Sequence, residues 1–547
     1  MEGPQAPESR RHSTVVAVLV IAGVAFLVVL PFLYFGIPSG HDFEFHLNSW
    51  MEIADQWKQG VVYPHWAAMA HYGYGEARFI FYPPLSWTLG AALGFVLPWK
   101  LVSAAYLCMV LTLSGCSMFL LARRWLGWSE ALFAAAFYAA NPYHLVIVYW
   151  RSAMAELLCA ACLPLLLLLI LNLEDDGPRM AAPLSLLLAA GWLTNVPGAV
   201  MMNYSLAVLV LWIAISRRSI AVAGYAALAA IFGAGLAAIY LLPAFHQQNW
   251  VSIAQVFAPG VHPQDNFIFT ITNDPDHNHF NLLVSIVAAS EILMVAAMLF
   301  LSRRTLARKL WWPMLTWSAI CVVLMLRPTL VLWMHMPELR FVQLPWRWLL
   351  CLNVPLALAI PLALRRWWLR GLICLAALGV VLVVWHRLLV PWWDTAADVQ
   401  ETLDNQHDGI GNEGTDEYVP VGIDSSEADR NAPLARFEGG GKAQIRVLTW
   451  HSESRLITVK AGAPGELVLR TFNYPSWDVR VNGLRVQTQT AEPAGQMLIP
   501  IPAGDSRVKI EFVEGWDRTL GGVISCVVFL VVIWFLISRR RLQPAPA

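Results

Sequence analysis

The residues best suited to chemistry stand at the end of the first long apolar run, in the segment GHDFEFHLNSW, residues 40–50. Within six residues this segment holds two carboxylates, Asp42 and Glu44, and two imidazoles, His41 and His46. A carboxylate here could act as a general base toward a hydroxyl group, or it could bind a divalent cation (Mg²⁺ or Mn²⁺) that bridges a diphosphate. A structural role is also open, because Asp42 could cap the N–H groups of a following helix and Glu44 would suit its dipole.

The residues after Asp42 predict a helix that lies along the membrane surface. Its apolar members recur at helical spacing: Phe43, Leu47, Trp50, Met51, Ala54 and Trp57. Such a helix would hold Asp42 and Glu44 near the level at which a lipid-linked substrate presents its phosphate. The histidines could complete a metal site or serve as interfacial anchors.

A second charged pair lies in NPYHLVIVYWRSAMAE, residues 141–156. Charges this close to an apolar run are costly unless they have a partner or a function. Arg151 is a candidate phosphate ligand, and Glu156 is a candidate second acidic residue of the site. The two could instead pair with each other, although a separation of five residues suits one helix face poorly.

Two other segments carry polar side chains between apolar runs. ELRFVQLPWRW, residues 338–348, contains Arg340 and Arg347, which could bind phosphate or anchor in lipid headgroups. The segment 262–281 collects aspartates and histidines, which could form a metal cluster but also match an ordinary solvated turn.

The composition indicates that most of the chain is dissolved in lipid. Of 547 residues, 58% are hydrophobic and only 14% are charged, and the mean hydropathy is +0.55. A net charge of zero argues against a nucleic-acid partner. The sequence has no nucleotide-binding glycine loop, no GxSxG and no HExxH, so direct use of a nucleotide substrate is unsupported.

Lysine and arginine residues set the expected topology, because they concentrate on the cytoplasmic side. If all basic pairs face the cytoplasm, the apolar runs between them cross the membrane in pairs, which predicts about twelve spans and two cytoplasmic termini. The expected spans are 14–36, 101–122, 129–141, 157–173, 181–194, 199–216, 220–242, 282–302, 311–326, 347–364, 370–390 and 519–538.

This topology divides the chain into a membrane domain (1–390), an extracytoplasmic domain (391–518) and a final helix with a basic tail (519–547). The outer segments are 37–100, 142–156, 195–198, 243–281, 327–346 and 391–518. Within the first, the apolar piece 85–98 is too short for a confident crossing, and we expect a re-entrant or interfacial helix.

Alternating polar and apolar residues predict a β-sandwich near the C-terminus. The alternating stretches are RLITVKA, GELVLRTF, WDVRVNG, QMLIPIP and SRVKIEFV. The polar stretch 394–440 before them is expected to be a long irregular connection. The expected fold is therefore a polytopic α-helical membrane protein with an extracytoplasmic β-sandwich domain.

The order of these motifs resembles a known group. A first span, an acidic outer segment with D-x-E, FIFYPPLSW (79–87) and then residues 141–156 resemble the C-type multi-spanning glycosyltransferase superfamily. GHDFEFHLNSWMEIADQWKQGVVYPHW and RFVQLPWRW are similar to bacterial membrane proteins labelled 6-pyruvoyl-tetrahydropterin-synthase-related. The resemblance covers about residues 14–390.

The superfamily resemblance implies transfer of a sugar from a polyprenyl-phosphate donor to a cell-envelope glycan or lipid, on the outer face of the bacterial cytoplasmic membrane. It implies that Asp42, with Glu44, serves as base or metal ligand and that Glu156 is the second acidic residue. The residues expected to bind the substrate are His41, His46, Arg78, Tyr82, Arg151, Arg340 and Arg347, with Tyr82 stacking on the sugar. No cofactor other than a divalent cation is expected.

Two other functions remain open at this stage. A transporter or flippase of lipid-linked glycans would need ionisable residues buried within its spans, and the expected spans carry almost none. A scaffold for envelope assembly without catalytic activity would use the β-domain to bind its partner. Transfer assays with variants at Asp42 and Glu44 would separate these possibilities.

Overall fold

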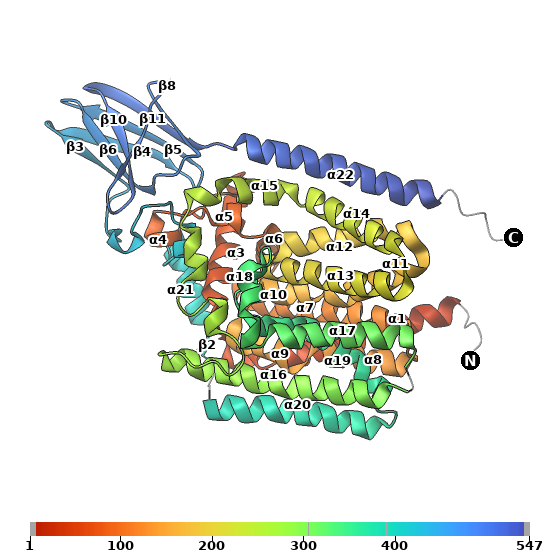
Figure 1. Ribbon diagram of the computed structural model, residues 1–547. Helices are drawn as coiled ribbons and strands as arrows, with labels where there is room; N and C mark the ends of the chain where they lie inside the picture. The colour runs from red at the N-terminus through yellow and green to blue at the C-terminus, as the bar shows by residue number, and fades with distance from the viewer. Residues whose placement is uncertain (1–6, 305, 389–391, 541–547) are drawn as a thin grey trace.

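The computed structural model describes residues 7–304, 306–388 and 392–540 as a bundle of long helices that carries a β-rich region at one end (Figure 1). The start of α1 (Pro7–Val29) and the end of α22 (Trp516–Arg540) lie together at the opposite end of the bundle (Figure 1). The chain is thus a polytopic helical membrane protein with a C-terminal β-rich region.

Eight helical segments of the described residues are long and apolar enough to cross a membrane. They are Ser13–Phe35, Trp99–Ala122, Trp128–Arg151, Met154–Leu173, Val196–Arg217, Pro275–Ser302, Pro345–Ala363 and Trp516–Ser538. Two bent pairs, Ile220–Leu236 with Ala238–Trp250 and Arg308–Leu324 with Arg327–His335, bring the number to ten if each pair is one span. The prediction of about twelve is therefore not confirmed: α12 (Ala181–Thr194) and α20 (Trp367–Leu388), on the expected spans 181–194 and 370–390, are not among these segments.

The first outer segment begins with the expected helix, α3 (Phe43–Lys58). Its apolar residues at helical spacing are buried, including Phe43, Leu47 and Trp50. Shorter helices follow: α4 (Ala70–Gly73), α5 (Arg78–Phe81) and α6 (Pro84–Val96). The short apolar helix expected at 85–98 is α6, which confirms its length and position.

The β-rich region consists of two antiparallel sheets whose buried side chains belong to one hydrophobic cluster. One sheet has the order β3-β6-β10-β9, with β3 (Ala435–Gly439), β6 (Gly465–Phe472), β10 (Gln496–Ile501) and β9 (Gln489–Ala491). The other has the order β4-β5-β11-β7-β8, with β4 (Ala443–Trp450), β5 (Ser454–Ala461), β11 (Gly504–Phe512), β7 (Trp477–Val481) and β8 (Leu484–Arg485). The five alternating stretches in the sequence are β5, β6, β7, β10 and β11.

The connection between bundle and β-rich region is more ordered than the sequence suggested. β2 (Trp393–Asp394) pairs with β1 (Ile37–Pro38), which precedes α3. α21 (Ala396–His407) follows, in a stretch that was expected to be irregular. Its N-terminus carries a capping box in which the side chains of Thr395 and Asp398 bind each other's backbone N–H groups, and this motif can be read from the sequence.

Candidate functional site

We call the segment between β2 and β3, which includes α21, the connector. A cavity of about 970 Å³ opens where the helical bundle meets this connector. Its walls come from the start of α3, the turn after α5, the helix pair around Arg151, the bent helix α15 (Ala238–Gln247) and the connector. Six of the ten residues proposed for the site line this cavity: His41, Asp42, Tyr82, Arg151, Glu156 and Arg347. Residues from two outer segments and from the start of the expected span 347–364 thus converge on one hollow.

The backbone around Asp42 is fixed against the backbone of Arg151. The Asp42 N–H donates to the Arg151 carbonyl at 2.9 Å, and the Gly40 N–H donates to Ser152 Oγ at 3.1 Å. Ser152 Oγ in turn donates to the carbonyl of Pro38 at 2.9 Å. The approach is so close that a Cβ on Gly40 would lie 2.6 Å from the carbonyl carbon of Arg151. These contacts bring the acidic segment and the arginine to the same wall.

Asp42 occupies the N-cap position of α3, but its side chain makes no capping hydrogen bond. Among the described residues, none forms a hydrogen bond or ion pair with its carboxylate, and Asp42 lines the cavity. Glu44 instead lines a separate hollow of about 330 Å³ beside α21. The structural alternative, in which the Asp42 side chain caps α3, is therefore not what the structure shows. Asp42 and Glu44, which were proposed to act together, line different hollows.

Arg151 and Glu156 pair with each other, and Arg347 joins them. Glu156 forms an ion pair with Arg151, and Arg347 Nε lies 3.0 Å from the same carboxylate oxygen. The other oxygen accepts a hydrogen bond from the Tyr143 hydroxyl at 2.8 Å. All three charged side chains are at least nine-tenths buried. With two guanidinium groups and one carboxylate, this set carries an excess positive charge on the cavity wall.

Three other expected substrate ligands do not line the cavity, and the structure corrects their roles. His46 is buried against Phe45 and Tyr82, and burial lowers its pKa to about 4, so it stays neutral. Arg340 is exposed and lies over the Phe257 ring at 4.8 Å.

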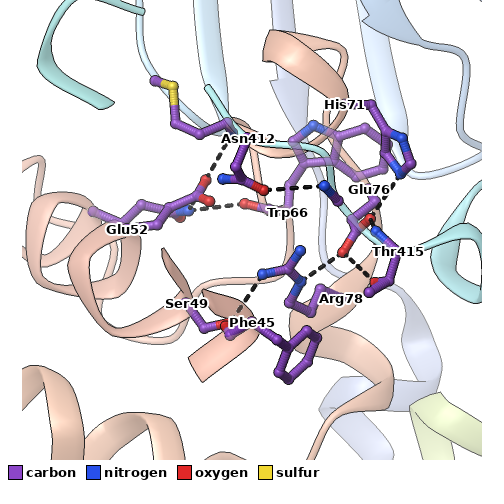
Figure 2. A network of polar contacts seen from close by, with 12 residues as sticks. Phe45, Ser49, Glu52, Trp66, His71, Glu76, Arg78, Asn412 and Thr415 are labelled. Atoms are coloured by element: carbon purple, nitrogen blue, oxygen red, sulfur yellow. Dashed lines mark hydrogen bonds and ion pairs between the residues drawn. The ribbon is translucent and has the colours of Figure 1, made fainter. Parts of the chain in front are cut away.

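The third of these, Arg78, is buried in a polar network that includes Ser49 of α3 (Figure 2). It donates to Glu76 at 2.5 Å and to Ser49 Oγ at 2.9 Å. Glu76 also accepts hydrogen bonds from the backbone N–H and the hydroxyl of Thr415, at 2.8 and 2.9 Å. His71 Nε2 lies 2.9 Å from the same carboxylate. The network therefore ties the first outer segment to the connector after the bundle.

Two residues at or near the cavity were missed by the sequence reasoning, Glu417 and Glu291. Glu417 lines the cavity and lies in a polar connector where nothing distinguishes it. His277, from the segment considered as a metal cluster, lines the cavity as well. Glu291 is buried within α16 (Pro275–Ser302) and accepts hydrogen bonds from the Tyr143 N–H (3.1 Å) and Asn353 Nδ2 (2.9 Å). In the sequence, Glu291 is marked only as a single glutamate within an apolar run. Its presence shows that the spans are less free of charge than expected.

Much of the cavity lining is apolar. Its lining includes Trp192, Val196, Val200, Leu241, Phe245, Ile253, Val256, Phe341 and Leu344. The cavity thus combines charged and apolar lining residues, which suits a ligand with an anionic head and a hydrocarbon chain.

A metal site made of Asp42 and Glu44 does not fit this geometry, because the two carboxylates line different hollows. Within the described ranges, no group of three or more His, Cys, Asp or Glu side chains is placed to hold a metal ion. Asp274, in the segment considered as a metal cluster, caps α16 by accepting from the N–H groups of Asp276 and His277. We therefore derive no step through a metal.

Residues 79–393, more than half of the chain, match the family model described as a 6-pyruvoyl-tetrahydropterin synthase related domain, membrane protein. The chain belongs to this family. The match covers Arg151, Glu156 and Arg347 and starts after Asp42. It confirms the narrower of the two resemblances found in the sequence.

No curated protein matches this member of the family. Two cryo-EM structures of the arabinofuranosyltransferase AftD from Mycobacteria, one of them a mutant, are similar at 18% and 16% identity, each with a TM-score of 0.41. The similarity covers 68% and 67% of this chain, which spans only 27% of the length of either structure. At this level it assigns no function.

Proposed function

We propose that this protein is a membrane glycosyltransferase that moves a sugar from a polyprenyl-phosphate donor to a hydroxyl group of a cell-envelope acceptor, outside the bacterial cytoplasmic membrane. The observation that carries the proposal is the cavity in which a carboxylate without a partner, Asp42, lies beside a pair of buried arginines. The apolar residues that line the same cavity support a lipid-linked donor.

In the proposed reaction, Asp42 takes the proton of the acceptor hydroxyl while that oxygen attacks the anomeric carbon of the sugar. The bond between this carbon and the phosphate oxygen breaks, and the polyprenyl phosphate leaves with the bonding electron pair. Arg151 and Arg347 offset the charge that develops on the leaving phosphate. Glu156 fixes the two guanidinium groups, since both of its oxygens are already occupied. Tyr82, on the wall beside Asp42, is available to stack on the sugar.

The test is transfer by the full-length protein in phospholipid vesicles, with decaprenyl-phosphate sugars as donors and octyl glycosides as acceptors. Asp42→Asn should lower the rate by about 100-fold or more, the usual contribution of a general base. Glu44→Gln is the matched control, because it removes a carboxylate two residues away that faces another hollow, and its rate should be unchanged.

Equal rates for Asp42→Asn and wild type would refute the assignment of the base. Movement of the intact lipid-linked sugar across the bilayer, with no transfer to any acceptor, would favour the transporter instead. Glu291 and the Arg151–Glu156–Arg347 set, which lie within spans, make this control necessary.

A further inference from the structure

We propose that Glu417, on the connector after the membrane bundle, is a further substrate-contacting residue of this site and binds hydroxyl groups of the acceptor glycan. The inference rests on the proposed function and adds the acceptor side to it. It makes the C-terminal region a part of the reaction site and not only an appendage of the bundle.

Glu417 lies in the short turn Asp416–Tyr418 and lines the same cavity as Asp42. Its neighbours Thr415 and Tyr418 line the cavity as well. Within the described part of the chain, no other residue forms a hydrogen bond or ion pair with the Glu417 carboxyl. The carboxyl accepts a hydrogen bond from the backbone N–H of Glu417 itself, and its remaining acceptor capacity is available to a ligand in the cavity.

Hydrogen bonds at three residues around Glu417 hold the connector in place. Thr415 donates its N–H and hydroxyl to Glu76 (Figure 2). Two residues after Glu417, the Val419 carbonyl accepts a hydrogen bond from the Ser252 N–H at 2.8 Å. Between them, the Tyr418 carbonyl accepts from the Ala77 N–H at 3.3 Å. The position of Glu417 is thus set by both the first outer segment and the segment after α15.

Gly414 permits the close approach that this arrangement needs. It has a φ of +78°, and a Cβ at this residue would lie 2.6 Å from His71 Nε2. The connector can therefore lie directly against the Glu76 network, one residue before Thr415.

Two tyrosines of the cavity lining, Tyr82 and Tyr418, are affected by the charges of Asp42 and Glu417 respectively. Burial raises the pKa of Tyr82, and the nearby Asp42 carboxylate raises it further. Burial likewise raises the pKa of Tyr418, with additional contributions from Glu417 and Tyr82. Tyr82 and Tyr418 both line the cavity, and each is close enough to one of the two carboxyls for its charge to act on the phenol.

The surroundings of Glu417 favour a neutral polyhydroxyl ligand over a phosphate. Burial raises the pKa of the Glu417 carboxyl to about 7; a hydrogen bond from its own backbone N–H and the charge of Arg78 lower it, and Glu76 and Asp416 raise it. A carboxyl in this state carries negative charge part of the time and repels an anion, and the cations of the cavity wall are at Arg151 and Arg347. Hydroxyl groups of a sugar remain as the matching partners.

Steady-state kinetics in the vesicle assay separate acceptor binding from general damage. Glu417→Gln should raise the KM for the octyl glycoside by about tenfold, as expected for a lost charge-assisted hydrogen bond, and leave the KM for the decaprenyl-phosphate sugar unchanged. Glu417→Asp keeps a carboxyl group, so its KM for the octyl glycoside should lie between the values of wild type and Glu417→Gln. Glu427→Gln is the matched control, because it removes an exposed carboxylate of the same connector outside the cavity. An unchanged acceptor KM in Glu417→Gln, or an equal rise in both KM values, would overturn the inference.

A second measurement does not depend on turnover. Dicyclohexylcarbodiimide adds across its C=N bond to protonated carboxyls in apolar surroundings and stays attached as an acylurea, which mass spectrometry can locate. We expect Glu417 to be labelled in the wild-type protein and protected by octyl glycosides but not by decaprenyl phosphate. If wild type transfers no sugar, the proposed function fails, yet protection would still support a glycan site at Glu417. Labelling without protection would overturn the inference whatever the transfer assay gives.

Discussion

The Glu76 network offers a direct measure of how firmly the connector is held against the cavity. Glu76 is completely buried and is bound by Arg78, His71 and Thr415. Burial by itself would raise the pKa of Glu76, but Arg78 and the hydrogen bonds from His71 and Thr415 lower it to about 2. A fall from the ordinary value near 4.5 corresponds to about 3 kcal/mol of stability. This agrees with the roughly 3–5 kcal/mol lost when one partner of a buried ion pair is removed.

The variant Glu76→Gln keeps the shape of the side chain and leaves the buried Arg78 without its counter-ion. The segment around Thr415 should then open about 100-fold more often, since about 1.4 kcal/mol is a factor of ten. Hydrogen–deuterium exchange with mass spectrometry measures this opening on the full-length protein in detergent micelles, in peptides that cover residues 411–420. Peptides from β11 serve as the internal reference, and Glu427→Gln serves as the control variant.

The pH dependence of this protection has a definite sign. Because the pKa of Glu76 is lower in the folded protein, its contribution is present above about pH 4.5 and is lost as the pH falls toward about 2. Wild-type protection of residues 411–420 should decline in this range, and protection in Glu76→Gln should not. The reasoning is refuted if Glu76→Gln protects this segment as well as wild type at neutral pH, or if it shows the same acid decline.

Two further predictions concern the first outer segment. Gly40→Ala should lower both the thermal midpoint and sugar transfer, because its Cβ would meet the backbone of Arg151 at 2.6 Å; an unchanged midpoint would show that the two segments can move apart. Burial raises the pKa of Glu52 to about 8, so its stabilising contribution should be lost as the pH rises from about 4.5 to about 8. In Glu52→Gln the thermal midpoint should depend less on pH over this range. A pH dependence equal to that of wild type would contradict the assignment.

The sequence predicts those parts of the fold that follow from local periodicity. The helix after Asp42, the short apolar helix near residue 90 and five strands could be identified because one face of each is buried, which leaves a period in the sequence. β3 and β4 were missed, since both are edge strands and much of β4 is exposed, which blurs the alternation. α21 was missed because a polar composition was taken as irregular structure, although Thr395 and Asp398 mark its start.

The candidate site could be predicted in part, for a different reason. Scarce charges at the ends of apolar runs point to Asp42, Arg151, Glu156 and Arg347, and these do meet at one cavity. Glu417 could not be found this way, because charge is common in the connector. Only the fold shows which of its carboxyls faces the cavity.

The pairing of Arg151 with Glu156 shows why spacing alone misled. Five residues apart on a continuous helix, the two side chains would point about 140° away from each other. The helix does not continue: Ser152 has a left-handed conformation, with φ 50° and ψ 30°, and separates the turn Ile147–Arg151 from α10 (Met154–Ala160). Ser152 is held there by its contacts with Gly40 and Pro38. The first outer segment therefore does more than contribute Asp42, because it also stabilises the break that lets Arg151 reach Glu156. For this reason a change at Gly40 should disturb the arginine pair as well as the proposed base.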